Sequence, residues 1–120
     1  MAREAYGKFS NFAPYGIEID GLWWKTPEYY FQAQKFLDEA HKEKIANAAD
    51  TKIAFKLGRS RAVSIRDDWE LIKDEVMYQA ILKKFQTYPK LRALLLSTED
   101  AEIIENSPLE KIIATSLILN

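Results

Sequence analysis

The chain of 120 residues contains no cysteine, only four glycines and four prolines, and a single histidine. The missing thiols exclude disulfides, thiolate metal sites and cysteine nucleophiles, and they are typical of a reducing compartment. We therefore expect a cytoplasmic protein. The sequence also lacks a signal-peptide core near its start and any apolar run long enough to span a membrane, so we expect no membrane partner.

Neither sign of charge is in excess, because 17 Lys and Arg stand against 18 Asp and Glu, for a formal net charge of -1. No overall electrostatic field would attract nucleic acid or an anionic membrane, although the composition does not exclude a local basic patch. An apolar content of 48% excludes a disordered chain. At this length we expect one small domain, residues 1–120, with a single core.

Local signals predict a mainly helical α+β fold, in which several helices accompany a small N-terminal β-hairpin. Residues 17–19 alternate in polarity before Asp20 and Gly21, a strong hairpin signal, and residues 22–24 form the returning strand. Thr26 is expected to cap a helix that begins at Pro27 and ends near Leu37.

Further helices are predicted along the rest of the chain. One covers residues 41–49, and the next is capped by Asp50 and stops at Gly58, taken as a left-handed C-terminal residue. Asp67 and Glu70 resemble a capping pair for a long helix that continues to about Phe85.

Two apolar stripes on this long helix predict burial on two sides and a central position. The stripes are Trp69, Ile72, Val76 and Ala80 on one side, and Leu71, Tyr78, Leu82 and Phe85 on the other. Tyr88 and Pro89 open a short helix, and Ser97 or Thr98 caps another.

The segment from residue 27 to residue 36 places one carboxylate and one amine in a dense cluster of aromatics. On a helix, Glu28, Gln32 and Lys35 share a face opposite the apolar arc, and Phe31 lies among them. An aromatic there indicates a covered face, such as a pocket wall, where a carboxylate is typical of a catalytic acid or base. Spacing alone leaves open an amphipathic helix with a solvated polar face.

Two other groups of residues could bind a ligand. The amide of Asn11 could donate to and accept from a sugar hydroxyl or a base edge, although a simple turn explains Asn11 equally well. Lys56, Arg59, Arg61 and Arg66 surround a helix end, and guanidinium groups bind phosphate in a bidentate manner. For Arg61 a solvated loop charge is the favoured interpretation.

The only histidine, His41, lies among charged residues and is expected to be exposed. A metal site needs several converging ligands, so we expect no metal and no other cofactor. The sequence shows no glycine-rich phosphate loop and no Ser/His/Asp arrangement.

Five ordered motifs extend from about Gly7 to Pro108. They are Gly7-Lys8-Phe9-Ser10-Asn11-Phe12-Ala13-Pro14, Thr26-Pro27-Glu28, Tyr30-Phe31-Gln32-Ala33-Gln34-Lys35-Phe36, Gly58-Arg59, and Arg66 before Asp68-Trp69 with Lys73 and Val76-Met77. Together they resemble the NADAR (YbiA-like) family. The resemblance implies an N-glycosidase that hydrolyses the C–N bond between ribose C1 and a nitrogen of a pyrimidine or purine. The implied substrates are ribosylamino-pyrimidine phosphates of early riboflavin synthesis or ADP-ribose on guanine, and nucleic acid would enter only as that ADP-ribosylated guanine.

The resemblance also implies roles for individual residues. Glu28 matches the catalytic glutamate, which would stabilise an oxocarbenium-like state or activate water. Lys35 would hold a phosphate or keep Glu28 ionised. The residues implied to bind sugar and phosphate are Asn11, Gln32, Lys35, Arg59 and Arg66. The family usually has histidine directly after the glutamate, where this chain has Tyr29.

The chain departs from the family pattern near its C-terminus. In register, Glu110 replaces the usual aspartate as a second catalytic residue, Ile113 the tryptophan and Ala114 the glycine. We also expect the N-terminal strand, the glycine-rich segment and the final helix of the family to be missing. One pocket wall is then absent, or rebuilt by apolar residues 109–119 against a second copy of the chain.

Three hypotheses follow from this comparison. The first is an active N-glycosidase. The second is a pseudoenzyme or binding module for a ribosyl phosphate or ADP-ribose. The third is a truncated relative whose fold is supported by self-association.

Overall fold

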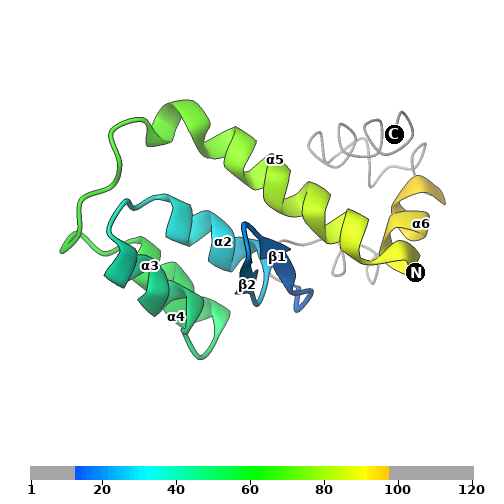
Figure 1. Cartoon of the computed structure of the whole chain (residues 1–120), viewed down its shortest axis with the longest axis horizontal. Coiled ribbons are helices and arrows are strands. Elements are labelled where there is room, and N and C mark those ends of the chain that lie inside the picture. Colours follow the sequence, from blue (N-terminus) through cyan, green and yellow to red (C-terminus); the bar gives the residue numbers. More distant parts are fainter. Residues whose placement is uncertain (1–12, 98–120) are drawn as a thin grey trace.

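The computed structural model describes residues 13–97. Within this range a hairpin precedes five helices, which confirms the mainly helical fold (Figure 1). The elements are β1 (Ile17–Ile19), β2 (Leu22–Trp24), α2 (Pro27–Gln34), α3 (Glu39–Ala46), α4 (Thr51–Gly58), α5 (Trp69–Thr87) and α6 (Pro89–Ser97).

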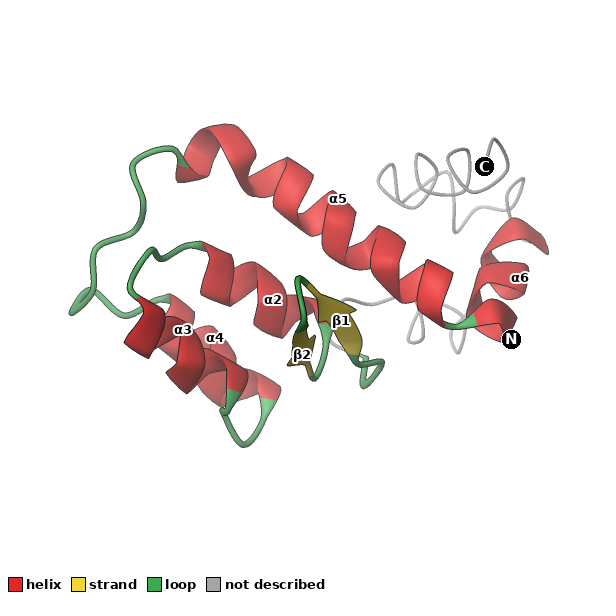
Figure 2. Ribbon diagram, viewed as in Figure 1, coloured by secondary structure: helices red, strands yellow, loops and turns green. Residues whose placement is uncertain are grey.

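Helix α2 is the hub of this arrangement. It packs against α3, α4, α5 and β2, while α6 packs against the far end of α5 (Figure 2). The prediction that the long helix α5 is central is therefore wrong. Leu71 of its second apolar stripe is 88% exposed, because the start of α5 packs on one side only.

The hairpin forms as predicted. Strands β1 and β2 pair antiparallel with Ile17 opposite Trp24 and Ile19 opposite Leu22. Asp20 and Gly21 turn the chain with φ angles of 54° and 81°. Two successive left-handed residues are what a tight two-residue hairpin turn requires.

Helices α2 and α3 begin at side-chain caps. The Thr26 hydroxyl accepts the Tyr29 N–H at 3.4 Å, which confirms this start. Helix α2 ends at Gln34 and not near Leu37, and the Lys35 carbonyl accepts the Arg66 N–H at 2.8 Å. The Asp38 carboxylate then accepts the His41 N–H at 2.9 Å, so α3 begins at Glu39 rather than at residue 41. It also ends earlier than predicted, at Ala46 and not at residue 49.

Helix α4 has the predicted cap, since the Asp50 carboxylate accepts the Ile53 N–H at 2.9 Å. The prediction of a left-handed Gly58 is wrong, because Asp20 and Gly21 are the only residues with positive φ in the described range. Gly58 instead belongs to the last turn of α4 and lies directly against Gln32 of α2. Close approach of two helices, and not a turn, explains this glycine.

Helix α5 lacks the capping pair predicted for Asp67 and Glu70. Its N-cap position is Asp68, which makes no side-chain capping bond because its carboxylate binds Arg66. The helix also continues past Phe85 to Thr87. The short helix opened by Pro89 is confirmed as α6. The further helix predicted from Ser97 or Thr98 lies outside the described residues.

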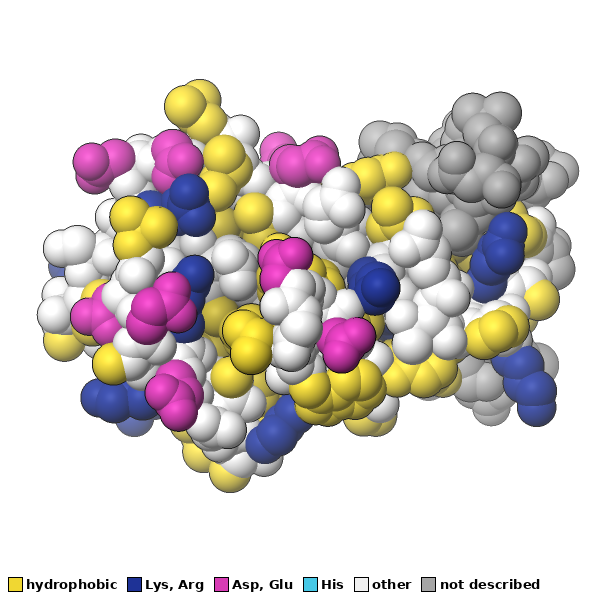
Figure 3. Space-filling model, viewed as in Figure 1, with side chains coloured by type: hydrophobic (Ala, Val, Ile, Leu, Met, Phe, Trp, Pro, Cys, Tyr) yellow, Lys and Arg dark blue, Asp and Glu magenta, His cyan; other side chains and the backbone are white. Residues whose placement is uncertain are grey.

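Two apolar clusters make up the described core. The smaller one joins the end of α5 to α6 through Ile81, Phe85, Leu91 and Leu95. The larger one surrounds α2 and consists of Ile17, Trp24, Tyr29, Ala33, Phe36, Ile45, Ala48, Ala54 and Ala80. No helix in residues 13–97 is long and apolar enough to cross a membrane. Acidic and basic side chains are interspersed on the face shown in Figure 3.

Candidate active site

The polar face of α2 is buried. Glu28 is 3% exposed and Gln32 is 2% exposed, and Lys35 is partly buried. Phe31 packs edge-on against Trp69 of α5, with ring centroids 5.0 Å apart. This face is covered, as the aromatic among the polar residues predicted, and the solvated alternative is excluded for Glu28 and Gln32.

Glu28 and Gln32 lie one helical turn apart and are joined directly. The Gln32 Nε2 donates to Glu28 Oε2, which fixes the plane of the carboxylate. The other amide atom, Gln32 Oε1, is buried and has no hydrogen-bond donor in the described part of the chain. It lies against Gly58 of α4.

Lys35 lies one turn further along the same face. Its Nζ donates to the Gly58 carbonyl at 3.4 Å and lies 6.0 Å from the centroid of the Phe31 ring. Burial lowers the pKa of Lys35 below its usual value, while the charge of Glu28 raises this pKa and the nearby Arg59 lowers it. Lys35 is thus close enough to Glu28 for the two charges to interact, as the spacing predicted.

Arg66 is already paired with a carboxylate. Its Nε and Nη2 donate to the two oxygens of Asp68 at 2.6 and 3.1 Å. This pair raises the pKa of Arg66 and lowers the pKa of Asp68. Arg66 also reaches Lys35, through its backbone N–H, at 2.8 Å from the Lys35 carbonyl.

Arg59 lies exposed after the end of α4, with its guanidinium carbon 5.5 Å from the centroid of the Phe55 ring. Arg61 is exposed as well, in agreement with its interpretation as a loop charge. Arg59 lies near enough to Lys35 to lower its pKa, and Arg66 contacts Lys35 through a backbone hydrogen bond. Their convergence on a single anion stays a prediction.

Tyr29, in the place of the family's usual histidine, belongs to the core. It is 2% exposed and its hydroxyl donates to the Ala48 carbonyl at 3.1 Å. Burial, with a smaller effect of Asp50, raises the pKa of Tyr29. A phenol held in this way stays protonated and does not point a proton carrier at Glu28.

His41 corrects another expectation, because it is only 5% exposed. Its Nε2 lies 2.9 Å from the Leu57 carbonyl and its ring packs edge-on against Phe36 at 4.4 Å. His41 therefore lies on the buried side of α3, although its neighbours in the sequence are charged. Within residues 13–97 no three His, Asp or Glu residues converge as a metal site would require.

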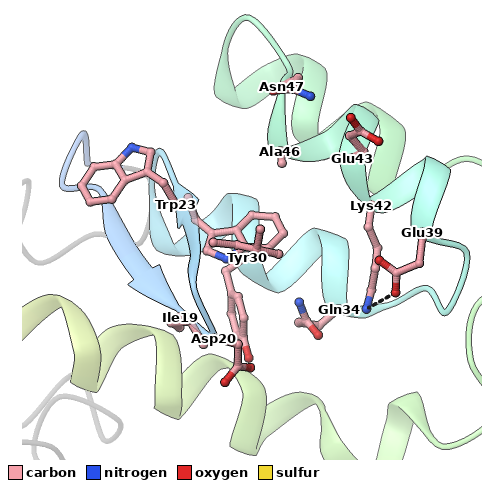
Figure 4. A pocket seen from close by; sticks show the side chains of 12 residues that line it. Ile19, Asp20, Trp23, Tyr30, Gln34, Glu39, Lys42, Glu43, Ala46 and Asn47 are labelled. Atoms are coloured by element: carbon pink, nitrogen blue, oxygen red, sulfur yellow. Dashed lines mark ion pairs between the residues drawn. The ribbon is translucent and has the colours of Figure 1, made fainter.

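A hollow of about 580 Å³ lies between the hairpin, α2 and α3 (Figure 4). Trp23 of β2 and Tyr30 of α2 line it together with the ion pair of Glu39 and Lys42, whose charged atoms are 3.9 Å apart. Neither Glu28 nor Lys35 lines this hollow, so the hollow is not the pocket predicted for these two residues.

Reasoning from the sequence missed this hollow. Residues 23 and 24 are both tryptophan, and strand alternation can place only one of them in the core. Trp24 is 3% exposed and Trp23 is 59% exposed. The exposed Trp23 was therefore the feature of the sequence that could have indicated this hollow.

Two candidate residues, Asn11 and Glu110, lie outside the described residues, and so does the apolar segment from Leu109. The predicted roles of Asn11 and Glu110, and self-association through that segment, stay predictions.

Comparison with known proteins gives this geometry a context. The model of the NADAR domain matches residues 1–117. The chain belongs to the NADAR family. It is 46% identical over 102 residues to N-glycosidase YbiA of Escherichia coli (strain K12), covering 85% of this chain and 64% of that protein. It is 45% identical over 108 residues to N-glycosidase Npun_R5314 of Nostoc punctiforme, covering 88% of this chain and 69% of that protein.

A more distant relative carries another name. The chain is 38% identical over 122 residues to the chloroplastic riboflavin biosynthesis protein PYRR of Zea mays, covering 88% of this chain but 19% of that protein. Among solved structures, it resembles the NMR structure of the E. coli protein YbiA with a TM-score of 0.83 and 36% identity, over 95% of this chain and 79% of that one. The NADAR fold is therefore shared, while the chain spans less than two thirds of the length of E. coli YbiA.

Proposed function

We propose that this chain is an N-glycosidase that hydrolyses the bond between ribose C1 and a nitrogen of a pyrimidine or purine, with Glu28 as its catalytic carboxylate. The observation that carries the proposal is the burial of Glu28, 3% exposed, beside Gln32 and within electrostatic reach of Lys35. Relatives named N-glycosidase support the same reaction class.

The proposed reaction needs one negative group near C1. As the C1–N bond breaks, its electron pair goes to the leaving nitrogen, which takes a proton, and C1 acquires oxocarbenium character. The oxygen of a water molecule then bonds to C1 and loses its proton. A carboxylate such as Glu28 lowers the barrier by stabilising the positive charge or by accepting that proton. In a site with little water, this stabilisation is larger than in solution.

The proposed substrates carry phosphate, which the cations around Lys35 would bind. Relatives named for riboflavin biosynthesis support a ribosylamino-pyrimidine phosphate, and ADP-ribose on guanine is the second proposed substrate. Lys35, Arg59 and Arg66 are the proposed phosphate ligands. Gln32 and Asn11 would bind the sugar, and Glu110 would supply a second carboxylate.

An alternative is a catalytically impaired module that binds ribosyl phosphate or ADP-ribose. The observation that favours it is Tyr29, which donates to the Ala48 carbonyl and so cannot relay a proton as a histidine could. The third possibility, a relative whose fold depends on self-association, rests on the segment from Leu109 and is tested by light scattering of the purified chain.

Glu28→Gln tests the enzyme directly, because it keeps the size of the side chain and removes its charge. We expect the wild type to release sugar phosphate from a ribosylamino-pyrimidine phosphate. Glu28→Gln should lower turnover by about a hundredfold to ten-thousandfold, with little change in binding. Glu18→Gln, at an exposed position of β1, is the matched control and should retain full turnover.

The result that would replace the enzyme by the binding module is equally specific. In that result, the wild type and Glu28→Gln are both inactive on ribosylamino-pyrimidine phosphate and on ADP-ribosylated guanine. Both proteins nevertheless bind both ligands in calorimetry.

A further inference from the structure

Gly58, at the end of α4, touches the proposed catalytic face. This glycine is buried and lies in the last helical turn, where its backbone does not need left-handed angles. Glycine in a helix costs stability relative to alanine, so a glycine without a conformational reason calls for a contact that explains it.

That contact is with Gln32. A Cβ added at Gly58 would overlap Gln32 Oε1 and would lie 2.8 Å from Gln32 Cδ and 2.9 Å from Gln32 Cβ. Turning the amide away could relieve the first two contacts. It could not relieve the third, because the position of Cβ is set by the backbone of α2. Any side chain at position 58 therefore pushes α4 away from α2 as well as displacing the amide.

The same residue also contacts the second polar group of the face. The Gly58 carbonyl accepts a hydrogen bond from Lys35 Nζ at 3.4 Å. Carbonyls in the last turn of a helix lack intrahelical partners and carry partial negative charge, so this one suits an ammonium group. One residue of α4 thus limits the positions of both Gln32 and Lys35.

We propose that Gly58 is a positioning residue, which holds Glu28 in its reactive orientation by confining the Gln32 amide between itself and the carboxylate. This inference rests on the proposed N-glycosidase activity. With Oε1 confined against the Gly58 backbone, Nε2 faces Glu28 Oε2 and holds the carboxylate plane. A larger residue 58 displaces the amide, and Glu28 loses the hydrogen bond from Gln32 although neither catalytic nor substrate atoms are changed.

A double-mutant cycle tests this role. Gly58→Ala and Gln32→Ala should each lower kcat roughly tenfold to a hundredfold with a smaller effect on KM, as small misplacements of reacting groups do. In the double variant, the two losses of kcat should be clearly less than additive, because the amide through which Gly58 acts is gone while the contact with the Cβ of residue 32 remains. Thermal unfolding should still show the cost of the close helix contact. Lys52→Ala, at an exposed position of α4, is the control and should leave kcat unchanged.

The pH profile adds a readout that a merely structural role would not move. Donation to an ionised carboxylate favours the ionised form, so both single variants should move the acid limb of the kcat profile to higher pH. Additive losses of kcat in the double variant, or an acid limb that stays in place in Gly58→Ala, would overturn the proposal.

A measurement without substrate separates this inference from the proposed activity. In ¹⁵N-labelled wild type, the two Gln32 side-chain amide protons should exchange slowly and shift in Glu28→Gln. In Gly58→Ala they should exchange rapidly, and if that variant unfolds, Gln32→Met should still lower kcat as Gln32→Ala does. An inactive wild type with the protected amide would refute the enzyme alone. An active wild type whose Gln32 amide is unchanged in Gly58→Ala would refute the positioning role alone.

Discussion

Replacing Asp68 with asparagine isolates the charge of Arg66 as a proposed phosphate ligand. In the structure the two oxygens of Asp68 accept from Arg66 Nε and Nη2 at 2.6 and 3.1 Å. A phosphate approaching Arg66 therefore meets a positive and a negative group side by side. The substitution removes the negative charge but keeps an oxygen that can accept from Nε, so the guanidinium should stay in position.

The expected gain in affinity for phosphate follows from the Coulomb forces that Arg66 and Asp68 exert at the surface. The side chains of Arg66 and Asp68 are 23% and 46% exposed, so water screens most of the interaction. At about 4 Å in water, one unit charge changes the affinity for a singly charged anion about sixfold. Salt and the width of an exposed site reduce this figure. We expect Asp68→Asn to lower KM for a ribosylamino-pyrimidine phosphate about twofold to sixfold, with kcat nearly unchanged.

The assay is a set of initial rates against substrate concentration at low and at high salt. The gain from Asp68→Asn should shrink as salt rises, because the attraction acts through solvent. Inorganic phosphate, tested as a competitive inhibitor, should bind the variant more tightly by the same factor. Calorimetric titration with ADP-ribose gives the corresponding readout if turnover is too slow to measure.

Asp67→Asn is the matched control, since it makes the same change in net charge one residue earlier in the chain. It should leave KM almost unaltered. The double variant Arg66→Gln/Asp68→Asn should lose the gain. An equal effect of Asp67→Asn, or a gain that survives in the double variant, would show that Arg66 does not bind the phosphate.

Two further predictions concern stability. Lys35→Met should be more stable than the wild type near pH 7, because burial lowers the pKa of Lys35 from 10.5 and its charged form therefore opposes folding. The unfolded chain binds the extra proton between the lowered pKa and 10.5, so wild-type stability rises there and the difference should narrow in melting curves recorded at increasing pH. A Lys35→Met variant less stable than the wild type at pH 7 would contradict this. Tyr29→Phe should cost about 0.5–1.5 kcal/mol in urea unfolding and leave kcat unchanged. The Ala48 carbonyl would still accept from Lys25 Nζ at 2.7 Å, and a tenfold fall in kcat would instead assign the hydroxyl to the reaction.

Local chemistry explains the elements that the sequence predicted well. The turn at Asp20 and Gly21 and the caps at Thr26 and Asp50 depend on one to four neighbouring residues. Such signals do not require knowledge of the fold, so a single sequence carries them. Pro89 opens α6 for the same reason.

The errors arise where a distant residue competes for the same group. Asp67 and Glu70 looked like a capped helix start, but the N-cap position of α5 is Asp68, and Arg66 occupies its carboxylate. Gly58 looked like a helix stop, but it serves a contact with a residue 26 positions earlier in the chain, since that contact is with Gln32. His41 looked solvated among charged neighbours, but Phe36 and the Leu57 carbonyl cover it. None of these partners can be found without the tertiary structure.

The candidate site shows both situations at once. Helix periodicity correctly joined Glu28, Gln32 and Lys35 on one face, and Phe31 correctly indicated that this face is covered. Periodicity could not show that the cover on one side is the backbone of α4, or that the hollow beside Trp23 lies elsewhere on α2.

The central position of α2 links stability to the proposed chemistry. Its apolar face supplies Tyr29, Ala33 and Phe36 to the larger core cluster, and its polar face is buried as well. Burying Glu28 and Lys35 is unfavourable unless each has polar partners. Gln32, which belongs to α2 itself, donates to Glu28. The Gly58 carbonyl of α4 accepts from Lys35. The fold can therefore hold a carboxylate away from water, where its charge acts most strongly on a developing cation, only while α4 stays closely packed on α2.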